Sequence, residues 1–238
     1  MKTVKSLKSQ ARRLLVGKYG ISSGIIGVYL VFKSMGSMMV TQFFSSSLIM
    51  FVLTQLLVLG MNILLEFFQV GLNKCFLDTA YGMHPSMGDL FIGFKKYCNR
   101  RFFGAVCMMS LIPTLCMLPA NLMTYLVSSF TKTQYVMFFV LLLLGLLVQI
   151  YFSIIYSQAF YVGFDMAQKS GMELLTMSKW LMKGAFGKYL GLILSFLPMH
   201  FLCIISFGVG YIWVLPYIET TKGTFYLELT KHKASGEV

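Results

Sequence analysis

The chain has 238 residues, of which 57% are hydrophobic and only 12% are charged, and its mean hydropathy is +0.75. Soluble domains carry about 25% charged residues, so this composition excludes an ordinary soluble protein and favours an integral membrane protein. The net charge of +12 does not indicate a nucleic-acid partner, because the basic residues cluster at the ends of apolar segments, where they set membrane topology and contact anionic lipid headgroups.

Candidate membrane spans follow from the length of the apolar runs, since a helix needs about 20 apolar residues to cross the hydrocarbon core. In chain order they fall at 19–41, 47–72, 102–127, 134–163 and 189–206, with a weaker sixth at 208–229. One helix from 189 to 215 would be about 40 Å long, so we expect a tight hairpin at Gly208 and Gly210. The sequence predicts an all-α polytopic membrane protein with six transmembrane helices in a single domain, residues 1–238.

The orientation follows from the placement of the 20 lysines and arginines. In the six-span arrangement all of them except Lys33 and Lys132 fall at the same side of the membrane. Because Lys and Arg concentrate on the cytoplasmic side, we expect cytoplasmic N and C termini and a location in the cell (plasma) membrane.

Three amphipathic segments, at 4–16, 87–98 and 174–185, each precede a span. Their apolar faces consist of Val4, Leu7, Ala11 and Leu14, then Met87, Leu90, Phe91, Phe94 and Cys98, then Leu174, Ser178, Leu181, Met182 and Ala185. We expect these faces to lie in the headgroup boundary, with anionic lipid contacted by Arg12, Arg13, Lys95, Lys96, Arg100, Arg101, Lys179 and Lys183. The pattern indicates a threefold repeat, although any multispan protein also needs basic flanks.

The second span carries a polar stripe, which is costly in hydrocarbon unless it is buried or paired. Gln55, Asn62, Glu66, Gln69 and Asn73 recur at helical spacing on one face. Candidate facing residues are Gln149 and Ser153 of the fourth span and Tyr217 of the sixth. Two interpretations remain open. The stripe lines a water-filled cavity or substrate path with Glu66 as its charged element, or it forms hydrogen bonds between helices.

The sequence contains no recognisable catalytic, cofactor or metal motif. The five cysteines have no CxxC spacing, and His200 has no second ligand nearby, so we expect small core side chains and a structural histidine. No phosphate loop or dinucleotide fingerprint is present. We therefore expect neither a cofactor nor a bound metal.

The C-terminal third carries the most specific motifs. Its stretch SKWLMKGAFGKYLGLILSF, followed by GVGYIWVLPYIETTKGTFYLEL, resembles the bacterial family known as domain of unknown function 975. The resemblance rests on Ser178, Leu181, Met182, Lys183, Gly184, Leu194, Ser195, Phe196, Gly208, Gly210, Pro216, Tyr217, Phe225 and Tyr226. ARRLLVGKYG and FIGFKKY are similar in style, whereas LPMHF at 197–201 departs from the tryptophan that the family tends to carry. The resemblance implies a six-helix membrane protein, mostly from Gram-positive bacteria, and no established chemistry.

Three functions are compatible with these features. The first is a non-enzymatic helper or scaffold that engages lipid or another membrane protein, and the second is a permease or lipid transporter that uses the second-span stripe. The third is an intramembrane enzyme, for which Glu66 and His200 are the available acid–base groups. A hydrated cavity reaching Glu66 would favour transport, whereas a dry, packed interior would favour the scaffold.

Overall fold

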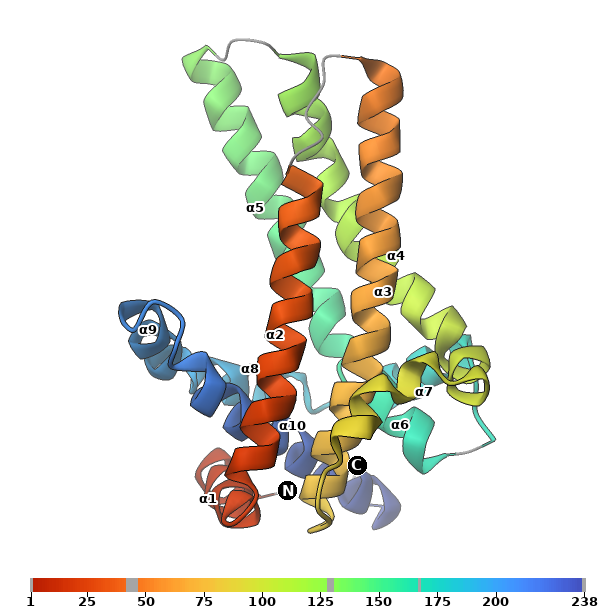
Figure 1. The fold of residues 1–238 in the computed structure, drawn as a ribbon, viewed down its shortest axis with the longest axis vertical. Coiled ribbons are helices and arrows are strands. Elements are labelled where there is room, and N and C mark those ends of the chain that lie inside the picture. The colour runs from red at the N-terminus through yellow and green to blue at the C-terminus, as the bar shows by residue number, and fades with distance from the viewer. Residues whose placement is uncertain (1, 42–46, 128–130, 167, 237–238) are drawn as a thin grey trace.

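The computed structural model describes residues 2–41, 47–127, 131–166 and 168–236. Every secondary-structure element in these ranges is a helix, which confirms the expected all-α class. Four long helices stand side by side as an upright bundle (Figure 1): α2 (Tyr19–Thr41), α3 (Leu48–Ala80), α4 (Lys96–Leu126) and α5 (Lys132–Ile155).

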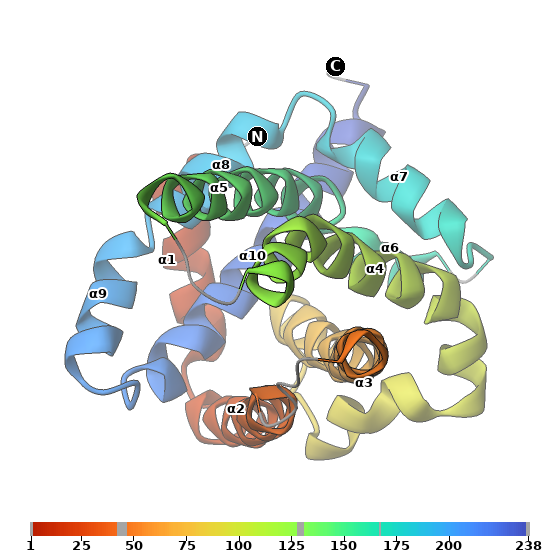
Figure 2. The same ribbon diagram turned by 90° about the horizontal axis from the view of Figure 1, so that it is seen from above.

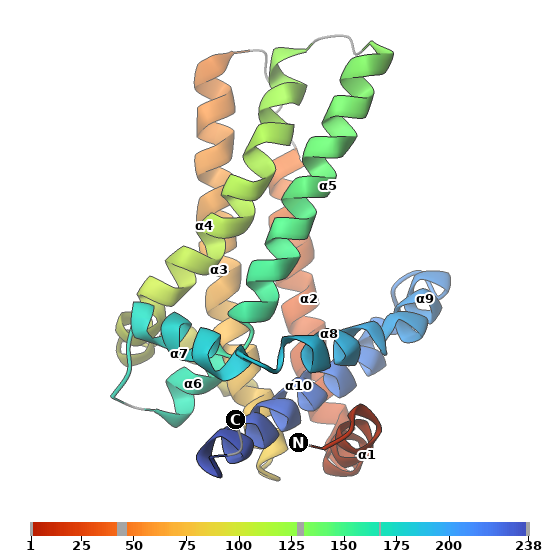
Figure 3. The same ribbon diagram turned by 180° about the vertical axis from the view of Figure 1, so that it is seen from behind.

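The shorter helices and α10 gather around one end of this bundle, which we call the base. They are α1 (Val4–Leu15), the 3-10 helix η1 (Met87–Phe94), α6 (Ala159–Asp165), α7 (Met172–Met182), α8 (Phe186–Leu194), α9 (Leu197–Ile205) and α10 (Tyr211–Ala234). Both ends of the chain lie at the base (Figure 3), where the backbone N–H of Lys2 donates a hydrogen bond to Glu228 Oε1 (2.8 Å). The two termini are therefore on the same side of the molecule.

Four helical segments in the described ranges are long and apolar enough to cross a membrane: Leu48–Ala80, Arg100–Leu126, Lys132–Asp165 and Phe186–Ile205. Residues 4–15 and 19–35 add a fifth if this pair, bent by 101°, counts as one broken span. These segments indicate a membrane protein. The expected sixth span at 208–229 corresponds to α10, which is not among them because Glu219, Lys222 and Glu228 lower its hydropathy. Six spans are thus not confirmed.

The last third of the chain forms a hairpin, as the glycines predicted. α9 ends at Ile205, and the chain turns back into α10 through Gly208, whose positive φ of 87° suits glycine. The expected span at 189–206 corresponds to the candidate span Phe186–Ile205, in which Ser195 and Phe196 separate α8 from α9. Pro198 lies in the first turn of α9, where its missing N–H costs no hydrogen bond, so it begins a helix and does not kink one.

The amphipathic segments differ from the expectation in what covers them. In α1, Leu7, Ala11 and Leu15 are buried in the protein core, where α1 packs against α10. The predicted face of α7 is likewise buried: Leu174, Ser178, Leu181, Met182 and Ala185. The 87–98 segment is not one α-helix, because η1 ends at Phe94 and α4 begins at Lys96. The faces of α1 and α7 therefore pack mainly on the protein's own helices.

Glycines allow the base helices to approach the bundle closely. A Cβ on Gly223 of α10 would lie 2.9 Å from the Phe76 carbonyl oxygen and 3.1 Å from Ala80 Cβ, both on α3. A Cβ on Gly71 of α3 would overlap the Leu90 carbonyl of η1. Viewed from above (Figure 2), α10 crosses beneath the upright helices, between α2 and α3 on one side and α5 on the other. α10 thus forms a floor under the bundle.

Candidate functional site

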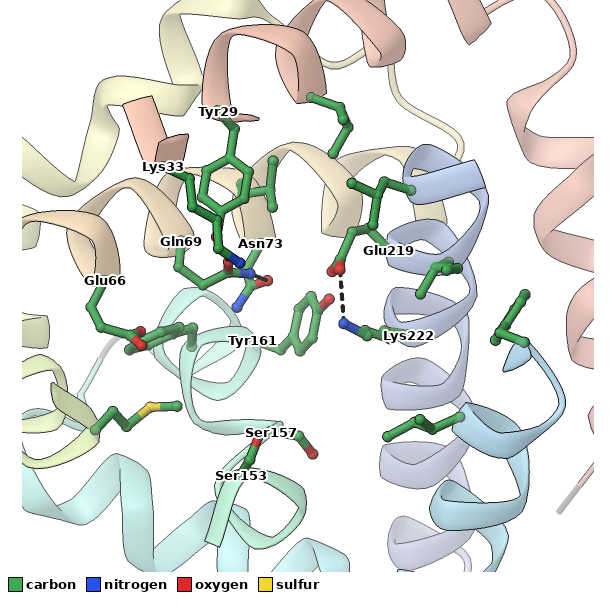
Figure 4. A pocket seen from close by; sticks show the side chains of 18 of the residues that line it. Tyr29, Lys33, Glu66, Gln69, Asn73, Ser153, Ser157, Tyr161, Glu219 and Lys222 are labelled. Atoms are coloured by element: carbon green, nitrogen blue, oxygen red, sulfur yellow. Dashed lines mark hydrogen bonds and ion pairs between the residues drawn. The ribbon is translucent and has the colours of Figure 1, made fainter. Parts of the chain in front are cut away.

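A partly open cavity of about 480 Å³ lies between the upright helices and α10. Its wall combines apolar residues with polar side chains from seven helices, drawn in part in Figure 4. The polar lining consists of Tyr29, Lys33, Glu66, Gln69, Asn73, Ser153, Ser157, Tyr161, Tyr189, His200, Glu219 and Lys222. The volume is within the range of about 300–1,000 Å³ typical of small-molecule sites.

Hydrogen bonds between α2 and α3 fix one wall of this cavity. The Tyr29 hydroxyl donates to Gln69 Oε1 (2.9 Å), and the Gln69 amide nitrogen donates to Asn73 Oδ1 (3.1 Å). Glu66, Gln69 and Asn73 share one helical face because they are three or four residues apart. This part of the stripe therefore bonds a neighbouring helix and also lines the cavity.

An ion pair on α10 forms the floor. The Lys222 ammonium lies 2.7 Å from Glu219 Oε1, and only 8% of the Glu219 side chain is exposed. Burial acts to lower the pKa of Lys222, but the adjacent Glu219 carboxylate outweighs burial and raises this pKa above its ordinary value. Lys222 is therefore charged at neutral pH.

Three of the buried polar atoms around the cavity have no hydrogen-bond partner within the described chain. They are Glu66 Oε2, Glu219 Oε2 and the Tyr161 hydroxyl. Glu219 and Tyr161 are 6% and 1% exposed. Buried polar atoms are normally hydrogen-bonded, and leaving one unpaired costs about 1–3 kcal/mol. The three residues line the cavity, although these atoms themselves are enclosed by the protein.

A second, smaller cavity of about 130 Å³ lies beside the first. Glu66, Met109 and Ser153 line both cavities, and the second is completed by Gln149 with mainly apolar residues of α4 and α5. Glu66 and the expected facing residues Gln149 and Ser153 are therefore brought together, whereas the lining includes no part of Tyr217.

The other stripe residues lie outside both cavities. Asn62 donates a hydrogen bond to Thr114 Oγ1 of α4 (3.2 Å), which matches the packing interpretation. Gln55 lies two turns further from the base, and its buried side-chain oxygen has no partner in the described chain. Tyr217 is buried, where its ring meets Phe196 edge to face at 5.4 Å.

Sequence reasoning missed part of the cavity lining. Tyr29 and Lys33 lie on an apolar helix without a polar stripe. Lys33 was expected on the external side of the membrane, but it reaches from α2 into the cavity (Figure 4). Lys222 was counted among the basic residues on the cytoplasmic side. The i, i+3 spacing of Glu219 and Lys222 was the available signal for their ion pair.

The basic residues expected to contact lipid lie on or next to α1, α7 and the start of α4. Most are exposed: Arg12, Arg13, Lys95, Lys96, Arg100, Lys179 and Lys183. Arg101 is half-buried and donates a hydrogen bond to the Gly163 carbonyl oxygen (2.9 Å). Arg12 lies over the Tyr217 ring at 5.7 Å. Some of these charges therefore also hold the fold together.

No group of three His, Cys, Asp or Glu residues is placed to hold a metal ion in the ranges that the structure describes. His200 lines the main cavity, and its ring packs against Tyr211 with centroids 5.7 Å apart. His200 and Glu66 thus border the same space.

Comparison with known proteins gives one family. Neither the curated proteins nor the solved structures contain a match. The family described as "Protein of unknown function (DUF975)" matches residues 1–233, which is nearly the whole chain. The chain therefore belongs to the DUF975 family.

Proposed function

We propose that this protein is a non-enzymatic carrier in the plasma membrane, with both termini in the cytoplasm, that takes a polar or amphiphilic molecule into the cavity at Glu66. The observation that supports this role is the cavity of about 480 Å³, whose polar lining comes from helices on both sides of the bundle. A scaffold needs no such space, because interhelical hydrogen bonds would be satisfied by close packing.

The arrangement of the lining favours binding over catalysis. The fixed groups are a phenol–amide–amide chain and an ion pair, which suit recognition of a polar group. An acid–base enzyme would instead place a nucleophile beside an oriented base. Glu66 and His200 remain the groups that an intramembrane enzyme would use.

The helper or scaffold role is supported by a separate surface. Phe201, Leu202, Ile204, Ile205 and Phe207, at the tip of the α9–α10 hairpin, are between 64% and 99% exposed. Large exposed apolar patches mark contacts with lipid or protein. In the carrier proposal this tip lies in lipid, and in the helper proposal it binds another membrane protein.

Accessibility of the cavity to water distinguishes these roles. Ser153 lines both cavities, whereas Ser110 on α4 is 1% exposed and serves as the matched control. Ser153→Cys and Ser110→Cys would be treated in membrane vesicles with a charged methanethiosulfonate reagent, and peptide mass spectrometry would locate the adduct, so the native cysteines are retained.

The carrier proposal predicts modification at position 153 and none at 110. Equal protection of both positions would contradict it and favour the scaffold.

A further inference from the structure

Two opposite charges in the cavity lack an ion-pair partner in the described chain. The described ion pairs are Lys2–Glu228, Lys74–Asp78 and Lys222–Glu219, so neither Lys33 nor Glu66 belongs to one. Lys33 on α2 and Glu66 on α3 line the same space, but their charged groups are more than the 4.0 Å of an ion pair apart. The two charges therefore attract each other across the cavity without a direct contact, and a bound molecule can contact both.

Glu66 requires a donor. Its Oε2 atom is buried without a hydrogen-bond partner, and a carboxylate away from water is stable only when it is paired or neutralised. The neighbouring stripe residues do not supply this donor, because the Gln69 amide donates to Asn73. A ligand ammonium, with several N–H groups, would satisfy Glu66.

Lys33 requires an acceptor. Lys33 is exposed and lines the cavity. Its ammonium lies 5.9 Å from the centroid of the Tyr29 ring, which provides a weak cation–π contact but accepts no strong hydrogen bond. A phosphate or carboxylate oxygen is the partner that a lysine ammonium normally binds. Lys33 therefore favours an anionic group on the ligand.

The charge balance of the lining selects between ligand classes. The lining contains two lysines, Lys33 and Lys222, and two glutamates, Glu66 and Glu219. Lys222 and Glu219 already form an ion pair with each other. A purely cationic ligand would leave Lys33 without an anion, and a purely anionic one would leave Glu66 without a cation. A ligand carrying both charges leaves neither uncompensated in surroundings of low dielectric.

We propose that the cavity binds a zwitterion, whose ammonium contacts Glu66 and whose phosphate or carboxylate contacts Lys33. This inference rests on the proposed carrier function and names its substrate class. The source is either a zwitterionic phospholipid, with its acyl chains outside the cavity, or a free zwitterion from the aqueous phase.

The test uses the purified full chain in detergent and native mass spectrometry with phosphatidylethanolamine and phosphatidylglycerol as probes. Wild type should retain phosphatidylethanolamine about tenfold more strongly than phosphatidylglycerol, because one lost charge-assisted hydrogen bond costs about that factor. Glu66→Gln and Lys33→Gln should each abolish this preference. The controls Glu173→Gln and Lys132→Gln, at exposed positions outside the cavity, should keep it.

A soluble probe identifies the source. If glycerophosphoethanolamine binds wild type with the same dependence on Glu66 and Lys33, the ligand is a free zwitterion; if only the lipid binds, it is a phospholipid. Both results support the inference, provided that thermal melting shows each variant to be folded. Absence of any preference, or a preference unchanged in both variants, would overturn it. If the zwitterion inference is overturned in this way but the Ser153→Cys variant is modified by the thiol reagent, the carrier function still stands. Protection of position 153 from the reagent would reject both the carrier function and the zwitterion ligand.

Discussion

The ion pair on the cavity floor gives the sharpest prediction about stability. Replacing Lys222 with methionine keeps the length of the side chain but leaves the Glu219 carboxylate, 8% exposed, without its partner at 2.7 Å. Removing one partner of a buried pair costs about 3–5 kcal/mol. Because 29% of the Lys222 side chain is exposed and solvent screens such a pair, we expect the lower end, about 3 kcal/mol.

For a chain of this size, about 3 kcal/mol corresponds to a decrease in Tm of roughly 6–12 °C. Thermal unfolding of the purified protein in detergent measures this change, with Lys179→Met on the exposed face of α7 as the matched control, expected within about 0.5 kcal/mol of wild type. The double variant Glu219→Gln/Lys222→Met leaves no unpaired charge and should regain at least half of the loss. A Lys222→Met variant as stable as Lys179→Met would show that the Lys222–Glu219 ion pair does not stabilise the fold.

Four further predictions follow from separate parts of the structure. Gly223→Ala should destabilise by about 1–3 kcal/mol because its Cβ would lie 2.9 Å from the Phe76 carbonyl oxygen, whereas Gly187→Ala, with open space around it, should not lower the Tm. Glu66→Leu should be at least as stable as wild type, since Glu66 Oε2 has no hydrogen-bond partner to lose. The same substitution should abolish ligand binding. A marked decrease in Tm would show that Glu66 has a structural role instead. Lys183→Cys should react with an impermeant reagent only from the cytoplasm and Lys132→Cys only from outside, and reaction of both from one side would exclude the proposed orientation. Neutralising Lys95, Lys96 and Arg100 should weaken retention of phosphatidylglycerol about 100-fold, at about 1 kcal/mol for each charge, and undiminished retention in native mass spectrometry would count against lipid binding there.

The long apolar helices could be predicted from the sequence, because hydropathy and length alone define them. The starts of α2 and α3 lie within one residue of the expected spans, although α3 runs on to Ala80. Its last turns, from Phe67 onward, are largely buried among the base helices, and a single sequence does not reveal which helices cover a segment. The expected end of this span at residue 72 lies where the helix becomes buried by protein, but the backbone stays helical to Ala80.

The position of α10 could not be predicted in the same way. Its apolar composition resembled a weak span, yet Glu219, Thr220 and Thr221 are buried inside the protein. Which polar groups find partners depends on tertiary packing, and hydropathy contains no information about it. Similarly, η1 is a 3-10 helix where Gly93 lies against the Phe67 carbonyl, a close approach that the apolar pattern of 87–98 does not reveal.

The candidate site was predicted in part for the same reason. A stripe on one helix is visible in the sequence, so Glu66, Gln69 and Asn73 were identified, and they line the cavity. Tyr29, Lys33 and Lys222 come from helices whose own patterns show no stripe. A cavity whose lining comes from eight helices depends on how those helices are arranged. The pattern of one helix predicts only the residues that this helix contributes.

The proposed carrier function requires a polar or amphiphilic molecule to enter the cavity at Glu66. The most direct measurement is the movement of phosphatidylethanolamine labelled on its acyl chain between the leaflets of proteoliposomes, followed by dithionite quenching, with wild type, Glu66→Gln and the control Glu173→Gln. For a phospholipid ligand, we expect wild type and Glu173→Gln to accelerate this movement and folded Glu66→Gln to leave it at the rate of protein-free vesicles. Equal acceleration by wild type and Glu66→Gln would contradict this expectation.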